Sequence, residues 1–156
     1  MNILPNYLII PALWLTVLWL GSALTSSGMA WYLTLVHSAI TPPSWVFVIA
    51  WNTIFVCAIL STILIWNRMF RDRVFWSIVI LLCINGITNL LWTYFFFYCH
   101  FMGLALIDAI VLLLCTWILV MVLWIKHEKL AALLFVPYAL WLVLAVYLNW
   151  MFILLN

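Results

Sequence analysis

The sequence predicts an all-α integral membrane protein, a bundle of five transmembrane helices. Its 156 residues are 72% hydrophobic and only 5% charged, which leaves too few polar groups to cover a water-soluble domain. The apolar residues form five long runs, and each run supplies the roughly 20 residues that a helix needs to cross a hydrocarbon core of ~30 Å. These runs are continuous rather than alternating in polarity, so they do not suit the strands of a membrane barrel.

Charged, proline or small polar residues separate the runs and set the expected elements of a single domain over residues 1–156. The first run has no basic leader and no clear small-residue cleavage site before it, so we expect it to be retained as a helix. The expected helices cover residues 3–24, 45–66, 74–97, 104–125 and 130–154, and a long loop covers 25–42.

The basic residues predict the orientation of the bundle. Arg68, Arg71 and Arg73 follow the second run, and Lys126 and Lys129 follow the fourth, so all five lie at one end of the bundle. Because cytoplasmic loops carry an excess of Lys and Arg, we expect a cytoplasmic N-terminus and a C-terminus outside. The outer loop 25–42 is longer than a simple helix connection needs, which indicates a lid; an interfacial aromatic anchor is the alternative.

Recognisable catalytic and metal-binding motifs are missing from the sequence. The four cysteines contain no C-x-x-C pair, and the three histidines lie in or near loops on two faces, so no metal site is expected. No phosphate-binding glycine loop or nucleophile elbow occurs, and the net charge of +2 is too weak to indicate nucleic-acid binding. No obligatory cofactor is expected.

Polar residues inside the apolar runs are the first candidates for function, because a polar side chain in hydrocarbon is costly unless it finds a partner. Asn89 lies deep in the third run, with Asn85 and Trp92 on nearly the same helix face, and Asn52 is a second deep amide. Asp108 lies near the start of the fourth run, where we expect a structural role that meets water or caps backbone amides. Interhelical hydrogen bonding alone is the alternative explanation for the amides.

The twelve tryptophans exceed what interfacial belts require. Trp51, Trp92 and Trp141 fall well inside their runs, where indole rings lining a pocket would suit a flat, largely apolar aromatic ligand such as a tetrapyrrole. Ordinary packing by bulky side chains is the alternative.

Several of these residues stand in ordered motifs that resemble the translocator protein family, also called the tryptophan-rich sensory proteins (TspO/MBR). The match covers nearly the whole chain from residue 31. The motifs are Trp31-Tyr32, Pro42-Pro43-Ser44-Trp45-Val46-Phe47 with Trp51, Asn89-x-x-Trp92 with Phe96-Phe97, Met102-Gly103-x-Ala105-Leu106-x-Asp108, and Pro137-Tyr138-x-x-Trp141-x-x-x-Ala145-x-x-x-Asn149.

The resemblance implies a five-helix bundle, a homodimer, and an interior pocket that opens toward the first loop. It implies binding of porphyrins such as protoporphyrin IX and haem, and of benzodiazepine-type ligands. The residues that it assigns to ligand binding are Tyr32, Pro43, Phe47, Trp51, Phe55, Asn89, Trp92, Trp141 and Ala145. It also makes Trp51 and Trp141 the candidates for a light-dependent breakdown of protoporphyrin.

Three departures from the family pattern limit what is carried over. His37-Ser38 replaces a Lys-Pro pair in the first loop, and Phe55 replaces a tyrosine, which removes one hydrogen-bond donor. No basic residue follows Tyr147, so the animal-type sterol motif is incomplete. This absence, together with the absence of a targeting segment, favours a bacterial inner membrane over a mitochondrial outer membrane.

Three functions fit these observations. We rank first a receptor-like protein that binds porphyrin and regulates tetrapyrrole levels or signals them, with porphyrin and membrane lipid as its partners. A transporter of porphyrins or other small lipophilic molecules is the second, although the sequence shows few of the broken helices and polar midplane residues typical of transporters. A photo-oxidative enzyme that degrades porphyrin is the third.

Overall fold

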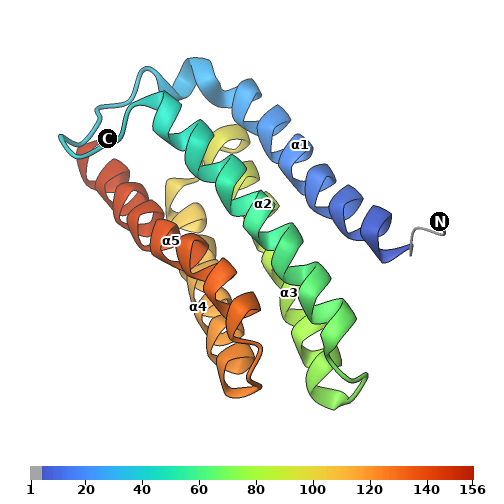
Figure 1. The fold of residues 1–156 in the computed structure, drawn as a ribbon. Helices are drawn as coiled ribbons and strands as arrows, with labels where there is room; N and C mark the ends of the chain where they lie inside the picture. The colour runs from blue at the N-terminus through green and yellow to red at the C-terminus, as the bar shows by residue number, and fades with distance from the viewer. Residues whose placement is uncertain (1–4) are drawn as a thin grey trace.

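Five α-helices and one short π-helix make up the fold, which a computed structural model describes for residues 5–156 (Figure 1). All five spans are long and apolar enough to cross a membrane, with the π-helix continuing the third, which confirms the predicted all-α class and the number of spans. The elements are α1 (Asn6–Tyr32), α2 (Ser44–Arg68), α3 (Arg73–Thr93), η1 (Tyr94–Tyr98), α4 (Met102–Ile125) and α5 (Lys129–Leu155).

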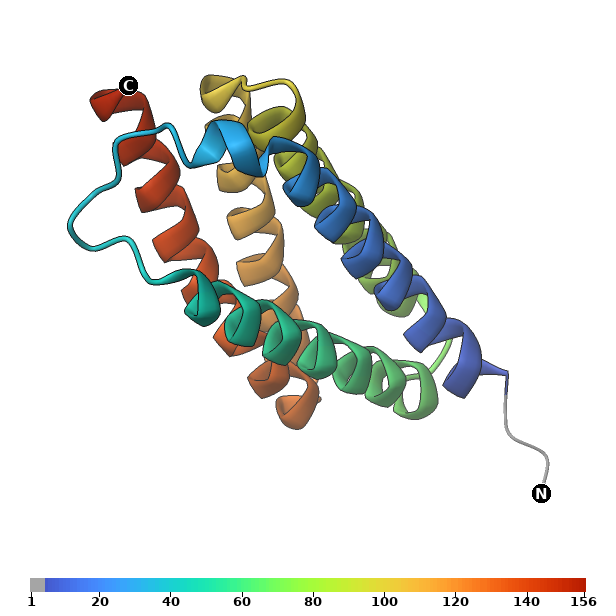
Figure 2. The ribbon, with the colours of Figure 1, turned by 90° about the horizontal axis from the view of Figure 1, so that it is seen from above.

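The helices pack side by side in a ring rather than in their chain order. α1 contacts α2, α2 contacts α5, α5 contacts α4, and α4 contacts α3 (Figures 1 and 2). Contacts of α1 with both α3 and η1 close the ring. The pairing of α2 with α5 encloses the space between them and α1. This enclosed space is where a ligand pocket can form.

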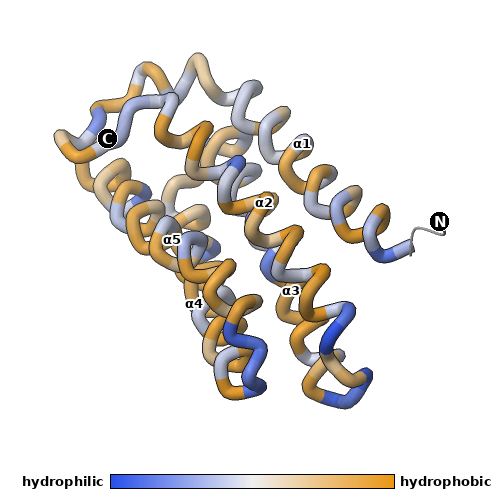
Figure 3. Tube along the Cα trace, viewed as in Figure 1, coloured by the Kyte–Doolittle hydropathy of each residue, from blue (hydrophilic) through white to orange (hydrophobic). Residues whose placement is uncertain are grey.

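The two ends of the bundle differ in polarity. The turns after α2 and α4 carry hydrophilic residues, visible as blue stretches in Figure 3, and we call this the basic end because all five Lys and Arg residues lie there. Arg71 lies between the rings of Trp66 and Phe75, with its guanidinium carbon 4.4 and 4.1 Å from their centroids. Asp72 caps α3 by accepting a hydrogen bond from the Phe75 amide at 2.8 Å.

The opposite end, which we call the loop end, holds residues 33–43 and the turn between η1 and α4. Here the structure differs from the predicted boundaries: α1 continues to Tyr32, so the predicted loop 25–42 shortens to 33–43. The polar run after Leu24 does not break the helix, and the Ser27 hydroxyl is satisfied within it by donating to the Leu24 carbonyl at 2.7 Å. The predicted start of this helix at residue 3 lies outside the described residues.

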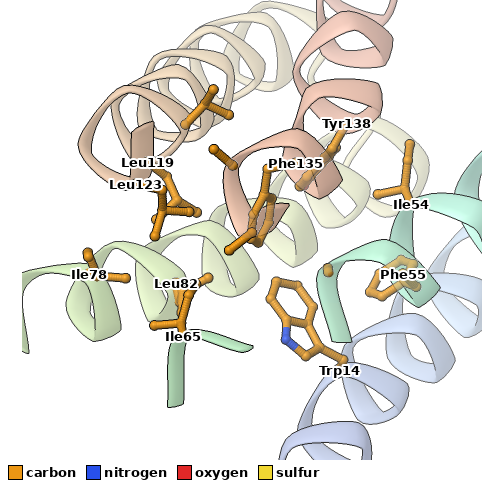
Figure 4. Packing of buried hydrophobic residues seen from close by; sticks show 14 of the residues in the cluster. Trp14, Ile54, Phe55, Ile65, Ile78, Leu82, Leu119, Leu123, Phe135 and Tyr138 are labelled. Carbon is orange, nitrogen blue, oxygen red and sulfur yellow. The ribbon is translucent and has the colours of Figure 1, made fainter. Parts of the chain in front are cut away.

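Large aliphatic and aromatic side chains fill the half of the bundle nearer the basic end. Phe75, Ile78, Leu119, Leu123 and Phe135 are fully buried there, in a cluster that reaches to Trp14, Phe55 and Tyr138 (Figure 4). Hydrogen bonds between helices accompany this packing. They join the Ser61 hydroxyl to the Ala131 carbonyl at 2.8 Å, the Asn85 amide to the Thr116 hydroxyl at 2.7 Å, and the Trp14 indole to the Thr62 hydroxyl at 3.0 Å.

A glycine permits the closest contact between helices at the loop end. Gly28 is buried where α1 crosses η1, and a Cβ atom placed on it would lie 2.0 Å from the carbonyl oxygen of Phe97. This backbone belongs to the π-helical turn, in which the Cys99 amide donates to the Tyr94 carbonyl five residues back, at 2.9 Å. α1 therefore rests on the backbone of η1.

Candidate ligand-binding pocket

A cavity of about 370 Å³ occupies the half of the bundle nearer the loop end, within the range of small-molecule sites. α1, α2, α3 with η1, and α5 form its walls. Its lining contains no charged side chain and no histidine among the described residues. The lining residues are Val17, Leu18, Gly21, Ser22, Thr25, Ser26, Met29, Tyr32, Ser44, Phe47, Val48, Trp51, Asn52, Phe55, Asn89, Trp92, Thr93, Phe96, Phe97, Trp141, Ala145, Leu148, Asn149 and Phe152.

Aromatic rings from four elements, α2, α3, η1 and α5, set the shape of the cavity. Phe47 of α2 meets Trp141 of α5 edge to face, with ring centroids 5.4 Å apart. On the adjoining wall, Trp92 stacks on Phe96 at 5.6 Å with an angle of 19° between the planes. Such rings present extended flat apolar faces, which favour a flat ligand.

The polar groups on the wall formed by α3 and α5 bond to each other across the helix interface. The Asn89 amide donates to the Tyr138 hydroxyl at 2.9 Å, and the Trp92 indole donates to the Asn149 side-chain oxygen at 3.0 Å. Asn149 in turn donates to the Met102 carbonyl at 2.9 Å, which links the wall to α4. This network fixes the rings in place and uses donors that a ligand would otherwise meet.

Eight of the nine residues assigned to ligand binding from the sequence line this cavity. The exception is Pro43, which immediately precedes the lining residue Ser44. Both candidate photochemical residues, Trp51 and Trp141, are among the eight. Their roles in binding stay predictions. Asn52, expected as a deep amide, lies exposed on α2 and donates to the Val48 carbonyl at 2.8 Å.

Asp108 lies outside the cavity, half-buried on α4. Its Oδ2 atom is buried, and among the described residues it has no hydrogen-bond partner. Oδ2 of Asp108 therefore does not cap a backbone amide, which was one of the two roles expected from the sequence.

The contribution of α1 to the cavity was missed by the sequence reasoning. Seven residues of α1 between Val17 and Met29 line it, together with Tyr32. A signal was present: Gly21, Ser22, Thr25 and Ser26 form a stripe of small and polar residues at helical spacing in an otherwise apolar run.

Loop 33–43 covers the cavity at the loop end. The Asn156 side chain bonds to both backbone groups of Val36, accepting from its amide at 2.9 Å and donating to its carbonyl at 3.3 Å. His37 packs edge-on against Tyr32 and Phe152, with centroids 4.8 and 5.4 Å apart. These contacts hold the loop against the end of α5, as Figure 1 shows.

The cavity lining carries apolar and uncharged polar side chains. Among residues 5–156, no group of three His, Cys, Asp or Glu side chains comes together in a way that could hold a metal ion. All four cysteines, none of which lines the cavity, are free thiols.

Comparisons with known proteins identify the family of this chain. The profile of the TspO/MBR family matches residues 9–155. The chain is 31% identical over 133 residues to the tryptophan-rich protein TspO of Bacillus cereus, covering 85% of this chain and 84% of that one. It is 32% identical over 137 residues to the protein of the same name in Chlorobaculum tepidum (87% and 86%), and 29% identical over 133 residues to protein CrtK of Rhodobacter capsulatus (81% and 78%). This chain is thus a multi-pass membrane protein that belongs to the TspO/MBR family.

Proposed function

We propose that this protein is a membrane receptor-like protein that binds porphyrins, such as protoporphyrin IX and haem, and related flat apolar ligands within the bundle. The observation that carries the proposal is the uncharged cavity of about 370 Å³ walled by aromatic rings. A flat conjugated ligand gains apolar contact and ring stacking in such a site without the desolvation of a buried charge. Binding of this kind would let the protein sense or regulate tetrapyrrole levels.

The packing of the bundle supports binding more strongly than transport. Transport needs access to the cavity from the basic end as well. The half of the bundle nearer that end is filled by buried side chains, among them Ile65, Ile78, Leu119 and Phe135. Passage would require those layers to separate, whereas binding requires no such change.

Light-dependent breakdown of a bound pigment is a second candidate, and one observation favours it. The indoles of Trp51 and Trp141 line the same cavity, and Trp51 lies 6.1 Å from the Tyr138 ring, centroid to centroid. Residues that are easily oxidised would therefore surround an excited porphyrin. Illumination of the bound pigment in air distinguishes the two functions, since a receptor leaves the pigment's absorption intact and an enzyme bleaches it over many turnovers.

The loop end, in this proposal, faces the outside of a bacterial cell membrane. The support is the placement of all Lys and Arg residues at the opposite end, because basic loops stay in the cytoplasm. We further propose a homodimer, as the family resemblance implies.

Equilibrium binding in the dark tests the proposal. Protoporphyrin IX is titrated into the purified protein, and binding is followed by the change in its visible absorption, so that the reporter is the same in every variant. Trp51→Leu and Trp141→Leu each remove a ring-stacking interaction that contributes about 0.5–1.5 kcal/mol to the binding free energy, so each should weaken binding by about two- to twelve-fold. Trp19→Leu is the matched control, because Trp19 is 69% exposed on α1 and does not line the cavity.

Two results would contradict the proposal. Absorption changes that never saturate would indicate partition into the micelle. Equal affinity in all four proteins would remove the ligand from this cavity.

A further inference from the structure

The cavity opens sideways, between α1 and α2. On this side several lining residues are exposed: Ser22 and Ser26 of α1, and Val48 and Asn52 of α2, with Val48 61% exposed. The opposite wall is closed, since Asn149 of α5 is only 1% exposed. Because these residues lie within membrane-spanning helices, the opening between them faces lipid rather than water.

The route from the loop end is obstructed by comparison. Loop 33–43 crosses that end, bonded to the last residue of the structure through Val36 and packed on Phe152 through His37. A lipid-soluble ligand already concentrated in the bilayer meets no such cover between α1 and α2. The lateral opening is therefore the shorter path into the cavity.

Hydroxyl groups without partners line this opening. Within the described chain, the side chains of Ser22, Thr25 and Ser26 make no hydrogen bond, whereas Thr16 and Ser27 of the same helix donate to backbone carbonyls at 2.8 and 2.7 Å. A free hydroxyl beside hydrocarbon is unfavourable until it finds a hydrogen-bond partner, and the acceptor of a bound ligand would be such a partner. The donors on the closed wall are engaged already, because Asn89 bonds to Tyr138 and Trp92 to Asn149.

We propose that the gap between α1 and α2 is a lateral portal that admits ligand from the bilayer, and that Ser22, Thr25 and Ser26 bind the ligand's polar edge. The ligand class is then a flat, lipid-soluble molecule whose hydrogen-bond acceptors, carboxyl or carbonyl oxygens, lie along one edge. The apolar face of the ligand lies on the rings of α3 and α5. Its acceptor oxygens stay at the opening, where they accept hydrogen bonds from the three uncharged hydroxyls. This inference rests on the proposed function and adds to it the orientation of the ligand in the cavity and the route by which it enters.

Obstruction of the portal tests the path. Protein in lipid vesicles is mixed with vesicles that carry protoporphyrin IX, and the rates of association and dissociation are followed by fluorescence. Ser22→Phe places a ring in the opening and slows both rates by roughly ten-fold, as a modest steric barrier does. Ala23→Phe is the control, because Ala23 is exposed on α1 but does not line the cavity.

Unchanged rates in Ser22→Phe, or equal slowing by Ala23→Phe, would overturn the portal. If Ser22→Phe does not fold, Val48→Phe obstructs the other rim, with its neighbour Ile49→Phe as control, since Ile49 is exposed and outside the lining. Failure of the proposed function looks different: the wild-type protein would then show no saturable binding at all.

The polar edge is tested by ligand preference. Ser22→Ala, Thr25→Val and Ser26→Ala are combined, and binding of protoporphyrin IX is compared with binding of etioporphyrin, which lacks carboxyl groups. Loss of three hydrogen bonds weakens binding of protoporphyrin IX by roughly ten-fold or more and leaves etioporphyrin unchanged. The control combines Thr16→Val with Ser27→Ala, whose hydroxyls bond to the backbone. Equal weakening of both porphyrins, or of neither, would overturn the assignment.

Discussion

Gly28 offers a sharp test of the packing at the loop end, because a single methyl group there would meet backbone rather than a movable side chain. The added Cβ of Gly28→Ala would lie 2.0 Å from the Phe97 carbonyl oxygen and 2.7 Å from its carbon. Ordinary contacts between carbon and oxygen begin near ~3.3 Å, so α1 or η1 must move by about 1.3 Å. Overpacking of this kind costs about 1–3 kcal/mol, more than the ~0.5–1 kcal/mol that alanine gains over glycine in a helix.

The same substitution elsewhere in the chain supplies matched controls. Gly86→Ala would place its Cβ 3.7 Å from a methyl group of Val17, an ordinary contact, and Gly103→Ala would meet nothing within 4 Å. Gly86→Ala should therefore show the full stabilisation that alanine gives a helix over glycine, without an overpacking cost. The free energies of unfolding of the Gly28 and Gly86 variants should then differ by about 2 kcal/mol.

Unfolding by sodium dodecyl sulfate in mixed micelles, followed by circular dichroism, measures these free energies. Gly28→Ala is expected below the wild-type protein, and Gly86→Ala level with it or above. If the two variants unfold at the same detergent fraction, α1 does not rest on the backbone of η1 as described.

Two further predictions concern hydrogen bonds between distant segments. In a double-mutant cycle of Asn89→Ala and Tyr138→Phe, the coupling free energy should be about 0.6 kcal/mol and at most ~1.7 kcal/mol, as for other hydrogen bonds between membrane helices; strictly additive effects in the same unfolding assay would contradict the bond. Asn156→Ala should speed hydrogen exchange at the Val36 amide, which loses its acceptor, and leave exchange in the helix interiors unchanged. Equal exchange at Val36 in both proteins would show that loop 33–43 is held by other contacts.

Much of the fold could be predicted because the bilayer imposes it. A helix that crosses hydrocarbon needs a long apolar run, so the five runs and the charges between them locate the spans to within a few residues everywhere except the end of α1. The positions of Asn89 and Trp92 on one face of α3 also followed from helix periodicity, and both line the cavity.

What could not be predicted depends on contacts between distant residues. Ser26, Ser27 and Gly28 read as the start of a loop, yet this stretch is helical: Ser27 satisfies its hydroxyl on the Leu24 carbonyl, and Gly28 fits against the Phe97 backbone. Neither contact is visible in the sequence alone. The π-helical turn of η1 is equally hidden, since Phe96 and Phe97 continue the apolar run without interruption.

The share of α1 in the cavity was hidden for a related reason. Its polar stripe was legible, but the ring order that brings α1 beside α2 and η1 is a property of the assembled bundle. The same order pairs α5 with α2, which brings Trp141 to Phe47.

The division of the bundle into a filled half and a hollow half bears on how its ligand preference could change. Most of the buried side chains that hold the five helices together lie in the cluster nearer the basic end. Rings such as Phe47 and Trp92 are only half-buried, and they line the cavity without packing against that cluster. Exchanging these rings should alter which molecule fits while the scaffold keeps its stability, so the hollow half can be redesigned on a base that stays folded.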